Sequence, residues 1–352
     1  MTRPALAVGV VGCGLIGGKR AAALAPHDVL VGVVDTDPAA SALLARRFGV
    51  PSCATAEDLI DRGAQVVVVA TPHDQLRRLG EVAIAAGADV LIEKPAGLGV
   101  ADIDALDSLA RREGRLVKVG FNHRFHPAIA RAVGEARSGA HGDVLHLRAR
   151  YGHGGRVGYD REWRADPRHS GGGELIDQGM HLIDISGWAL GQPPLHSALL
   201  RTQYWDTPVD DNAALILGDG DSRTGAWAML HATWTEWKNM FSLEIYCRTG
   251  KLQVDGLAAS YGRQRLQVFK MRPEMGPPDV ETVEYPHGDE SWQAEWEHFA
   301  GDLPATALVA DVADQIEAAG KPFRVVDADG RPLGEVDARI IVDILIGRKL
   351  PQ

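Results

Sequence analysis

The chain has 352 residues, of which 45% are hydrophobic and 24% are charged. That length suffices for two domains with separate cores, and the composition is that of a folded chain, which excludes wholesale disorder. The net charge is −10 and no long basic run occurs. We therefore expect no nucleic-acid partner, because such binding depends on attraction between basic side chains and phosphates.

The first strand is predicted from Ala5, and no basic segment followed by an apolar stretch precedes it. No window approaches the ~20 apolar residues that a membrane span needs, so neither a signal peptide nor a membrane partner is expected. The cysteines Cys13, Cys53 and Cys247 are scattered and never form C-x-x-C. We expect a cytoplasmic protein without a disulfide framework or a thiolate metal site.

Short apolar runs alternate with helix-like segments over the first 120 residues. Strands that are apolar throughout are buried on both faces, and helical crossovers between them imply a parallel sheet. The pattern predicts a doubly wound α/β domain of the Rossmann type. The predicted strands are Leu6–Val11, Val29–Val34, Val66–Ala70, Val90–Ile92 and Leu116–Val119.

The pattern changes after Phe121. A helix (127–136), a strand (144–151) and an apolar helix (174–190) are followed by consecutive strand-like runs over residues 213–269. Strands without helices between them favour a large, mostly antiparallel sheet in an α+β domain. We predict a cofactor domain (1–123) and a substrate-binding and oligomerisation domain (124–352). Further helices are predicted at 290–299, 309–319 and 336–346, the last packing back on the first domain.

The first strand runs directly into the G-x-G-x-x-G motif of residues 12–17. Because the motif follows a buried strand and opens a helix, its backbone N–H groups predict a dinucleotide pyrophosphate site. Gly12 permits the tight turn, Gly14 lets the pyrophosphate approach the backbone, and Gly17 lets helix and strand pack closely. The motif residues expected at the cofactor are Gly12, Gly14, Leu15, Ile16 and Gly17.

Asp35 ends the second predicted strand, where an acid is expected to bind the adenosine ribose 2′-OH and to repel a 2′-phosphate. Thr36, Asp37 and Pro38 follow, without Arg or Lys. NAD is therefore favoured over NADP. In the alternative interpretation the glycines only shape a turn and Asp35 only caps the next element.

Two later motifs carry titratable side chains. The first is Glu93-Lys94-Pro95, at the end of a buried strand, where ligands bind in such folds. The second is G-G-G-E-L-I-D-Q-G-M-H over residues 171–181, in which Asp177 and His181 share one helical face.

The order G-x-G-x-x-G, E-K-P and G-G-x-x-x-D-x-G-x-H resembles the glucose–fructose oxidoreductase / inositol dehydrogenase / rhizopine catabolism family. Residues 120–127 (G-F-N-H-R-F-H-P) resemble its G-x-N-x-R segment, and residues 242–256 resemble its G-x-L-x-V-D strand pair. The resemblance covers essentially the whole chain.

The resemblance implies that Lys94, Asp177 and His181 form the catalytic group. Imidazole titrates near neutral pH, so His181 is the expected general acid/base, with Asp177 orienting it or binding substrate. Lys94, next to a Lys–Pro bond that is often cis in the family, would stabilise the reacting oxygen. Alternatively, Lys94 is the main proton carrier. A purely structural role, with Lys94 paired to Glu93 and His181 satisfied by Asp177, is the competing interpretation.

The resemblance also implies cofactor contacts beyond the glycine motif. The family often has a His four positions after T-P, where this chain has Leu76, with His73 nearer. Together with Asp35, the expected cofactor residues are Thr36, Thr71, Pro72, His73, Glu93, Lys94, Asn122, Arg124, Trp163 and Arg164.

A glycine-rich loop follows Tyr151, within a region that holds seven of the 13 histidines. Flexible glycines between hydroxyl, imidazole and guanidinium groups suit a polyhydroxylated or phosphorylated substrate. No H-E-x-x-H or comparable spacing occurs, so no metal is expected, and most of these histidines can equally be surface residues. The expected substrate residues are Lys94, His123, Tyr151, His153, Arg156, His169, Asp177 and His181.

Trp227, Trp234 and Trp237 lie in the region of the second predicted sheet. In the family the outer face of this sheet commonly forms the subunit interface, so exposed aromatics would fit a homodimer or homotetramer; core packing is the alternative.

The resulting hypothesis is an NAD-dependent enzyme that moves a hydride between nicotinamide and a secondary alcohol or ketone carbon of a sugar, cyclitol or nucleotide sugar. Two alternatives remain open. One is a redox-neutral enzyme that uses bound NAD transiently for elimination or glycoside cleavage. The other is a non-catalytic NAD sensor.

Overall fold

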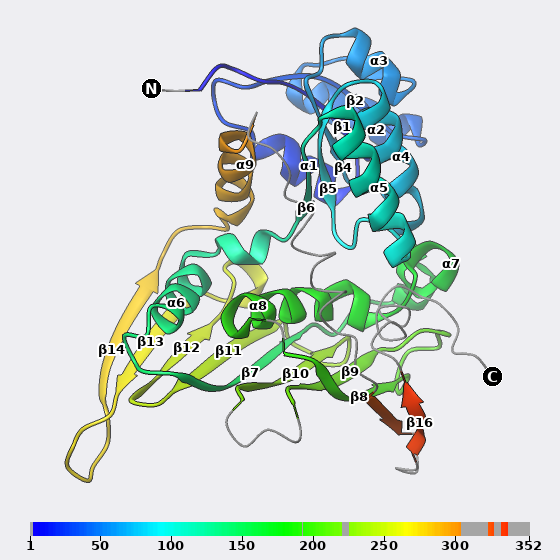
Figure 1. Ribbon diagram of the computed structural model, residues 1–352. Helices are drawn as coiled ribbons and strands as arrows, with labels where there is room; N and C mark the ends of the chain where they lie inside the picture. The colour runs from blue at the N-terminus through cyan, green and yellow to red at the C-terminus, as the bar shows by residue number, and fades with distance from the viewer. Residues whose placement is uncertain (1–2, 192, 220–224, 304–322, 327–331, 337–352) are drawn as a thin grey trace. The chain divides into compact units, whose positions relative to one another are not determined.

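The computed structural model describes residues 3–191, 193–219, 225–303, 323–326 and 332–336 (Figure 1). The described chain forms two compact units. Unit 1 comprises residues 3–122 and 292–303, and unit 2 comprises the remainder. The helix predicted over 309–319 lies outside the described residues. The same holds for residues 337–346 of the last predicted helix, and with them for its predicted packing on the first domain.

Unit 1 contains a six-stranded sheet with strand order β3-β2-β1-β4-β5-β6, in which all neighbouring strands are parallel. The strands are β1 (Ala7–Val11), β2 (Val29–Val34), β3 (Ser52–Cys53), β4 (Val66–Val69), β5 (Asp89–Glu93) and β6 (Val117–Gly120).

This sheet is buried on both faces. In β4, Val67 and Val69 belong to one apolar cluster, whereas Val66 and Val68 belong to the other. Because both faces are covered, β4 consists of valine alone and shows no polar alternation. The helices of unit 1 are α1 (Leu15–Ala22), α2 (Pro38–Phe48), α3 (Ala56–Asp61), α4 (His73–Ala85), α5 (Val100–Glu113) and α9 (Ser291–Gly301).

The late helix α9 contributes to the core of unit 1. Trp296 and Phe299 are buried in the same cluster as Val8 and Val33. The Trp296 Nε1–H also donates to the carboxylate of Asp28 at 2.7 Å. The chain therefore contributes a late helix to its first unit, between segments that belong to the second.

Unit 2 is built on a larger sheet with strand order β14-β13-β12-β11-β7-β10-β9-β8-β15-β16. Its pairs are antiparallel except β7 with β10 and β8 with β15. The strands are β7 (Val144–Gly152), β8 (Leu195–Arg201), β9 (Asn212–Leu217), β10 (Trp227–Thr233), β11 (Met240–Cys247), β12 (Gly250–Asp255), β13 (Gln264–Lys270), β14 (Asp279–Tyr285), β15 (Phe323–Val326) and β16 (Pro332–Val336).

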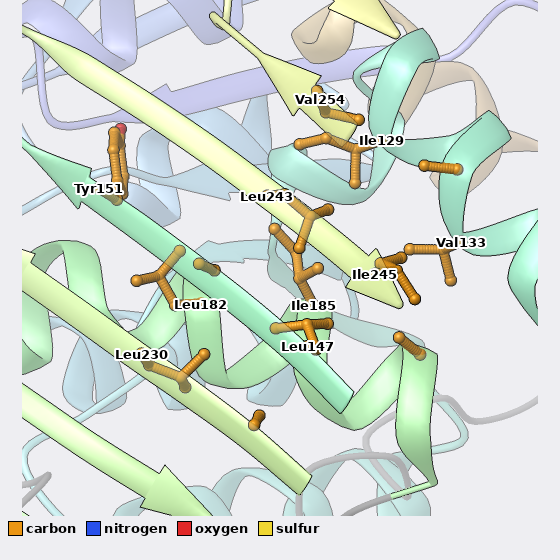
Figure 2. Close-up of a cluster of buried hydrophobic side chains, with 14 of the residues drawn as sticks. Ile129, Val133, Leu147, Tyr151, Leu182, Ile185, Leu230, Leu243, Ile245 and Val254 are labelled. Atoms are coloured by element: carbon orange, nitrogen blue, oxygen red, sulfur yellow. The ribbon is translucent and has the colours of Figure 1, made fainter. Parts of the chain in front are cut away.

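One face of this sheet is the core of unit 2. Burial alternates along β9, β11 and β12, as expected when one face is covered and the other is half-exposed. Helices α6 (Pro127–Arg137) and α8 (Met180–Leu190) pack on the covered face through Ile129 and Ile185 (Figure 2). Unit 2 also contains α7 (Pro167–Ser170), a π-helix (Leu175–Gly179) and 3₁₀-helices at Asn122–Phe125, Tyr159–Arg161, Trp163–Ala165 and Ala259–Tyr261.

The two sheets confirm the predicted fold class, a Rossmann domain and an α+β domain with a mostly antiparallel sheet. The helix expected over 174–190 begins as a π-helix and becomes α-helical at Met180. Among the described helices, none is long and apolar enough to cross a membrane.

Candidate cofactor and acid–base sites

The glycine motif forms the turn between β1 and α1. Gly12 has φ +99°, and a Cβ there would lie 2.3 Å from the Ala70 carbonyl oxygen. A Cβ on Gly17 would lie 1.8 Å from the carbonyl oxygen of Gly12, whereas one on Gly14 would meet nothing within 4 Å. Two glycines thus permit close packing, and the third leaves its backbone open to an approaching group. This arrangement fits a pyrophosphate at the start of α1.

Asp35 follows β2 and lies beside this turn. Its carboxylate accepts hydrogen bonds from the backbone N–H of Cys13 at 2.6 Å and of Asp37 at 2.8 Å. Burial, together with the charge of Asp35, raises the pKa of Cys13 to about 11, so the thiol stays protonated. The side chain of Asp35 is half-buried. A carboxylate held in this way fits a ribose diol, which donates hydrogen bonds.

The other predicted cofactor residues of unit 1 follow β2, β4, β5 and β6. Thr36 is exposed, Thr71 and Pro72 lead into α4, and His73 is buried in the first turn of that helix. Asn122 is also buried. The half-buried Lys94 follows β5, and its peptide bond to Pro95 is cis, as the family resemblance implies.

Glu93 belongs to a buried charge cluster. Arg20 of α1 bonds Glu93 through Nε at 2.7 Å and Glu295 of α9 through a terminal nitrogen at 2.5 Å. A Cβ on Gly120 would lie 2.3 Å from the Arg20 guanidinium, so only glycine leaves room for it. Burial raises the pKa of Glu295 despite the nearby charge of Arg20. Arg20 thus links the last turn of α1 to the end of β5 and to α9.

In unit 2, the G-G-G segment introduces the helix that carries Asp177 and His181. A Cβ on Gly173 would lie 1.9 Å from the carbonyl oxygen of Asp210, so no larger residue fits there. The Asp210 carboxylate accepts the N–H groups of Gly173 at 3.1 Å and Leu175 at 2.8 Å. Asp210 therefore fixes the beginning of this helix by satisfying its first donors.

Three titratable side chains gather in this unit. His153, Glu174 and Asp177 each have one ligand-type atom within 4.8 Å of the others. Glu174 is fully buried and was not among the predicted site residues. Its position three residues before Asp177 on the same helical segment is the sequence signal that identifies it. Arg164 donates to Asp177 through Nε at 3.2 Å, which balances part of this negative charge.

The hydrogen bonds of His153 favour a donor role for its ring. Its Nδ1 accepts the N–H of Gly155 at 2.9 Å, so in the neutral ring the proton is on Nε2. Burial lowers the pKa of His153, although the charge of Asp177 opposes this shift. A metal ion would need an unprotonated Nε2. The geometry therefore favours a hydrogen-bond donor beside the two carboxylates over a metal ligand.

His181 lies in the first turn of α8 and stacks on His123. The ring centroids are 3.7 Å apart with an interplanar angle of 23°, and both rings are buried. Tyr151 contacts both, with centroids 5.0 Å from His123 and 6.1 Å from His181. Burial raises the pKa of Tyr151 well above its usual value, with smaller contributions from Tyr261, Asp177 and Glu174. The Tyr151 hydroxyl is therefore neutral, and the charges of the two carboxylates contribute to its raised pKa.

Of the remaining predicted residues of unit 2, Arg164 contacts the cluster of His153, Glu174 and Asp177, whereas the other basic residues pair with carboxylates elsewhere. Arg164 lies over the Trp163 ring, 4.6 Å from its centroid, while bonded to Asp177. Arg124 forms a bidentate pair with Asp184 of α8, with a shortest distance of 2.6 Å. The remaining two are more exposed. Arg156 pairs with Glu162 at 2.6 Å, and His169 lies on α7 with Nε2 4.0 Å from Asp166.

The two sets of residues have distinct chemical capacities. Unit 1 offers a glycine turn, a helix start and a carboxylate that suit a dinucleotide. Unit 2 offers buried acid–base groups, tyrosine hydroxyls and an arginine–aspartate pair, which can bind hydroxyl groups and accept or donate a proton. A nucleotide fold joined to an acid–base cluster is typical of nicotinamide-dependent oxidoreductases.

Comparison with protein families agrees with this class. Residues 6–121 match the model of the oxidoreductase family with an NAD-binding Rossmann fold, and residues 130–253 match the model of the GFO/IDH/MocA C-terminal domain. The chain belongs to the GFO/IDH/MocA oxidoreductase family, as its motifs predicted.

Curated relatives include several dehydrogenases. Levoglucosan dehydrogenase of Pseudarthrobacter phenanthrenivorans is 26% identical over 60% of this chain and 58% of its own length. Myo-inositol dehydrogenase Hyg17 of Streptomyces leeuwenhoekii is 30% identical over 53% of this chain and 56% of its own length. A dTDP-3,4-didehydro-2,6-dideoxy-alpha-D-glucose 3-reductase of Streptomyces violaceoruber is 28% identical over 90% of this chain and 87% of its own length. Several of these matches, including the first, span only about half of the relative's length.

Solved structures share the fold. GenD2 from gentamicin A biosynthesis, in complex with NAD, has a TM-score of 0.73 and 25% identity, covering 99% of this chain and 94% of that chain. Levoglucosan dehydrogenase in complex with NADH has a TM-score of 0.77 and 23% identity, covering 89% and 96%.

Proposed function

We propose that this protein is an NAD-dependent dehydrogenase or ketoreductase acting on a secondary alcohol or ketone carbon of a sugar, cyclitol or nucleotide sugar. The observation that carries the proposal is a pair of acid–base groups in unit 2. Asp177 lies with Glu174 and His153, and His181 of the same short segment stacks on His123. Tyr151 contacts both rings, and its pKa responds to the charges of Asp177 and Glu174. Relatives named for sugar and inositol oxidation support the substrate class.

The proposed cofactor is NAD, held by the glycine turn and Asp35 of unit 1. When bound, the nicotinamide supplies the hydride acceptor or donor of the reaction. The Asp35 carboxylate favours NAD over NADP, because it accepts bonds from a ribose 2′-OH and repels a 2′-phosphate. The cofactor contacts proposed from the resemblance also include Thr36, Thr71, Pro72, His73, Glu93, Asn122, Arg124, Trp163 and Arg164.

We assign the proton chemistry to His181, with Lys94 and Asp177 completing the catalytic group. His181 would take the hydroxyl proton during oxidation, since imidazole titrates near neutral pH. The Lys94 ammonium would stabilise developing charge on the reacting oxygen. Asp177, paired with Arg164, would orient the substrate through its hydroxyl groups. Tyr151, His153, His123, Arg156 and His169 are the further substrate contacts proposed.

The half-exposed face of the unit 2 sheet is proposed to mediate self-association into a homodimer or homotetramer. Trp227, His146 and Tyr246 stack across this face, with centroids 5.1 and 4.3 Å apart. Light scattering tests this assignment: a Trp227→Glu variant that remains folded should shift the mass towards the monomer.

The function is tested by incubating the purified chain with NAD, or with NADP, against inositols, free sugars, sugar phosphates and nucleotide sugars. Formation of reduced nicotinamide with NAD, and much less with NADP, is the expected result. Tight cofactor binding without turnover of any compound would contradict a dehydrogenase.

A further inference from the structure

We propose that Trp237 and Tyr204 form a stacking platform for the second, non-reacting sugar ring of a neutral glycoside. The proposal rests on the proposed function and deepens it, because it assigns a substrate class larger than a single ring. Both side chains are exposed, by 66% for Trp237 and 59% for Tyr204, although each carries a large apolar surface. Their ring centroids lie 4.8 Å apart at 82°.

The platform is the outer end of a continuous series of aromatic contacts. Tyr204 packs against Trp205 with centroids 5.2 Å apart, and Trp205 packs against Tyr159 at 5.8 Å. Tyr159 in turn packs against His153 at 5.4 Å, edge to face. His153 is a member of the cluster with Glu174 and Asp177. The exposed pair is thus joined to the acid–base groups through residues of one unit.

The glycine-rich loop after β7 is what allows this arrangement. A Cβ on Gly155 would lie 2.6 Å from Cζ2 of Trp205, and a Cβ on Gly154 would lie 3.0 Å from the Cα of Trp237. Because these glycines have no side chain, two tryptophans can pack closely against the loop that carries His153. The loop motif, which predicts a substrate contact, thus also provides space for aromatic side chains.

The backbone beneath the platform is held in place. The buried Asp211 carboxylate accepts N–H bonds from Gln203, Tyr204 and Trp205 at 2.7 to 3.0 Å. Trp205 Nε1 donates to the Trp234 carbonyl at 3.2 Å. Trp237 has φ +56°, a conformation that a bulky residue rarely adopts. An exposed aromatic side chain on a strained backbone, packed against a second segment that is held by hydrogen bonds, fits a binding position.

The chemistry of this surface favours a neutral ring over a phosphate-bearing group. The apolar C–H face of a pyranose packs well on the electron-rich face of an aromatic ring. Arg156 and Arg164, the guanidinium groups near this region, both pair with Glu162, and Arg164 also pairs with Asp177. Their charge is therefore balanced by carboxylates. Because His153 and Tyr159 separate the platform from Asp177, a ring stacked on it is not the ring that reacts.

Binding of D-glucose, cellobiose and maltose, measured by saturation-transfer NMR without cofactor, tests the proposal. We expect at least one disaccharide to bind about five- to tenfold more tightly than glucose, with saturation on both of its rings. Trp237→Ala and Tyr204→Ala should remove this gain, whereas Trp237→Tyr should keep most of it. Met275→Ala, which removes an exposed apolar side chain elsewhere in unit 2, is the control.

Equal affinity for glucose and both disaccharides would overturn the proposal, as would a gain that survives in Trp237→Ala. Weaker NAD binding in Trp237→Ala without any change in disaccharide binding would also overturn it. The binding experiment requires neither cofactor nor turnover, so the platform and the dehydrogenase can fail separately. A disaccharide gain that Trp237→Ala removes would support the platform even if no compound of the substrate panel were oxidised with NAD, a result that would contradict the dehydrogenase alone.

Discussion

Asp210 and Asp211 are consecutive residues whose carboxylates hold two different segments of the candidate site. Asp210 accepts the N–H groups of Gly173 and Leu175, at the start of the helix that carries Asp177 and His181. Asp211 accepts the N–H groups of residues 203–205, which carry Tyr204 and Trp205. One dipeptide between β8 and β9 therefore positions both the acid–base residues and the aromatic platform.

This division of roles predicts different effects for two isosteric variants. Asp210→Asn loses one acceptor oxygen for the helix that carries Asp177 and His181. If these residues act as proposed, kcat should fall about tenfold or more, because small displacements of reacting groups are costly. Asp211→Asn should leave kcat for a monosaccharide within about threefold and reduce the preference for a disaccharide. Steady-state kinetics with both substrates separate the two effects. Equal losses of kcat in both variants would show that the dipeptide acts as a single structural unit.

Gly155 and Gly158 offer a matched pair for the contact between the loop and Trp205. Both have positive φ, +67° and +88°, but a Cβ meets Trp205 only at Gly155. Gly158→Ala should lower the free energy of unfolding by about 1 kcal/mol through backbone strain alone. Gly155→Ala should cost about 1–3 kcal/mol more, because Trp205 must move. Denaturant unfolding measures both, and identical losses would mean that Trp205 adapts without cost.

The charges around His153 predict the direction of its titration. Burial lowers its pKa, Asp177 opposes the shift, and Arg164 and Arg156 add to it. Its NMR titration midpoint should therefore lie below about 6.5, fall further in Asp177→Asn and rise in Arg164→Gln. Because the folded-state pKa is depressed, this imidazole lowers stability as the pH falls below its unfolded pKa. A midpoint that rises in Asp177→Asn would place the carboxylate too far away to interact with the ring.

Asp28 predicts an acid-sensitive contribution to the stability of unit 1. Burial alone would raise its pKa, but hydrogen bonds from Arg3, the Leu6 N–H and Trp296 outweigh this and lower it to about 2. Asp28→Asn should lose about 2 kcal/mol of unfolding free energy at neutral pH. The contribution is complete above the unfolded pKa of about 3.9 and is lost as the pH falls through the folded value.

The deficit of Asp28→Asn relative to the native chain should therefore shrink below about pH 4. Asp61→Asn, which changes an exposed carboxylate of the same unit, serves as the control. A deficit that does not depend on pH would mean that the charge of Asp28 contributes nothing.

Periodicity and glycine positions predicted both sheets because those signals are local. The all-valine β4 is uninterrupted because both of its faces are covered, and Gly12 precedes α1 as the motif requires. Glu174 was missed because a single glutamate before a helix is ordinary in sequence, and its burial depends on tertiary packing. The sequence predicts flexibility for the glycines at 154 and 155. Their close packing against Trp237 and Trp205 could not be predicted, because these tryptophans are distant in the chain.

Asp35 should determine the choice of cofactor. Asp35→Ala should raise the KM for NAD about tenfold and narrow the preference over NADP, since a hydrogen bond to the ribose is lost and the repulsion of a 2′-phosphate is removed. Asp37→Ala removes a carboxylate that bonds the Ala39 N–H at the start of α2, and it should leave this preference unchanged. An unaltered preference in Asp35→Ala would assign the selectivity to another residue.

Transfer of deuterium from the substrate carbon to the nicotinamide tests the dehydrogenase most directly. A sugar or inositol oxidised in the panel would carry deuterium at the reacting carbon, and mass spectrometry would follow it into reduced NAD released to solution. We predict labelled, released NADH with the native chain and a loss of at least about a hundredfold in rate with His181→Ala. Label that never leaves the protein-bound cofactor, or a rate unchanged in His181→Ala, would contradict the proposed function.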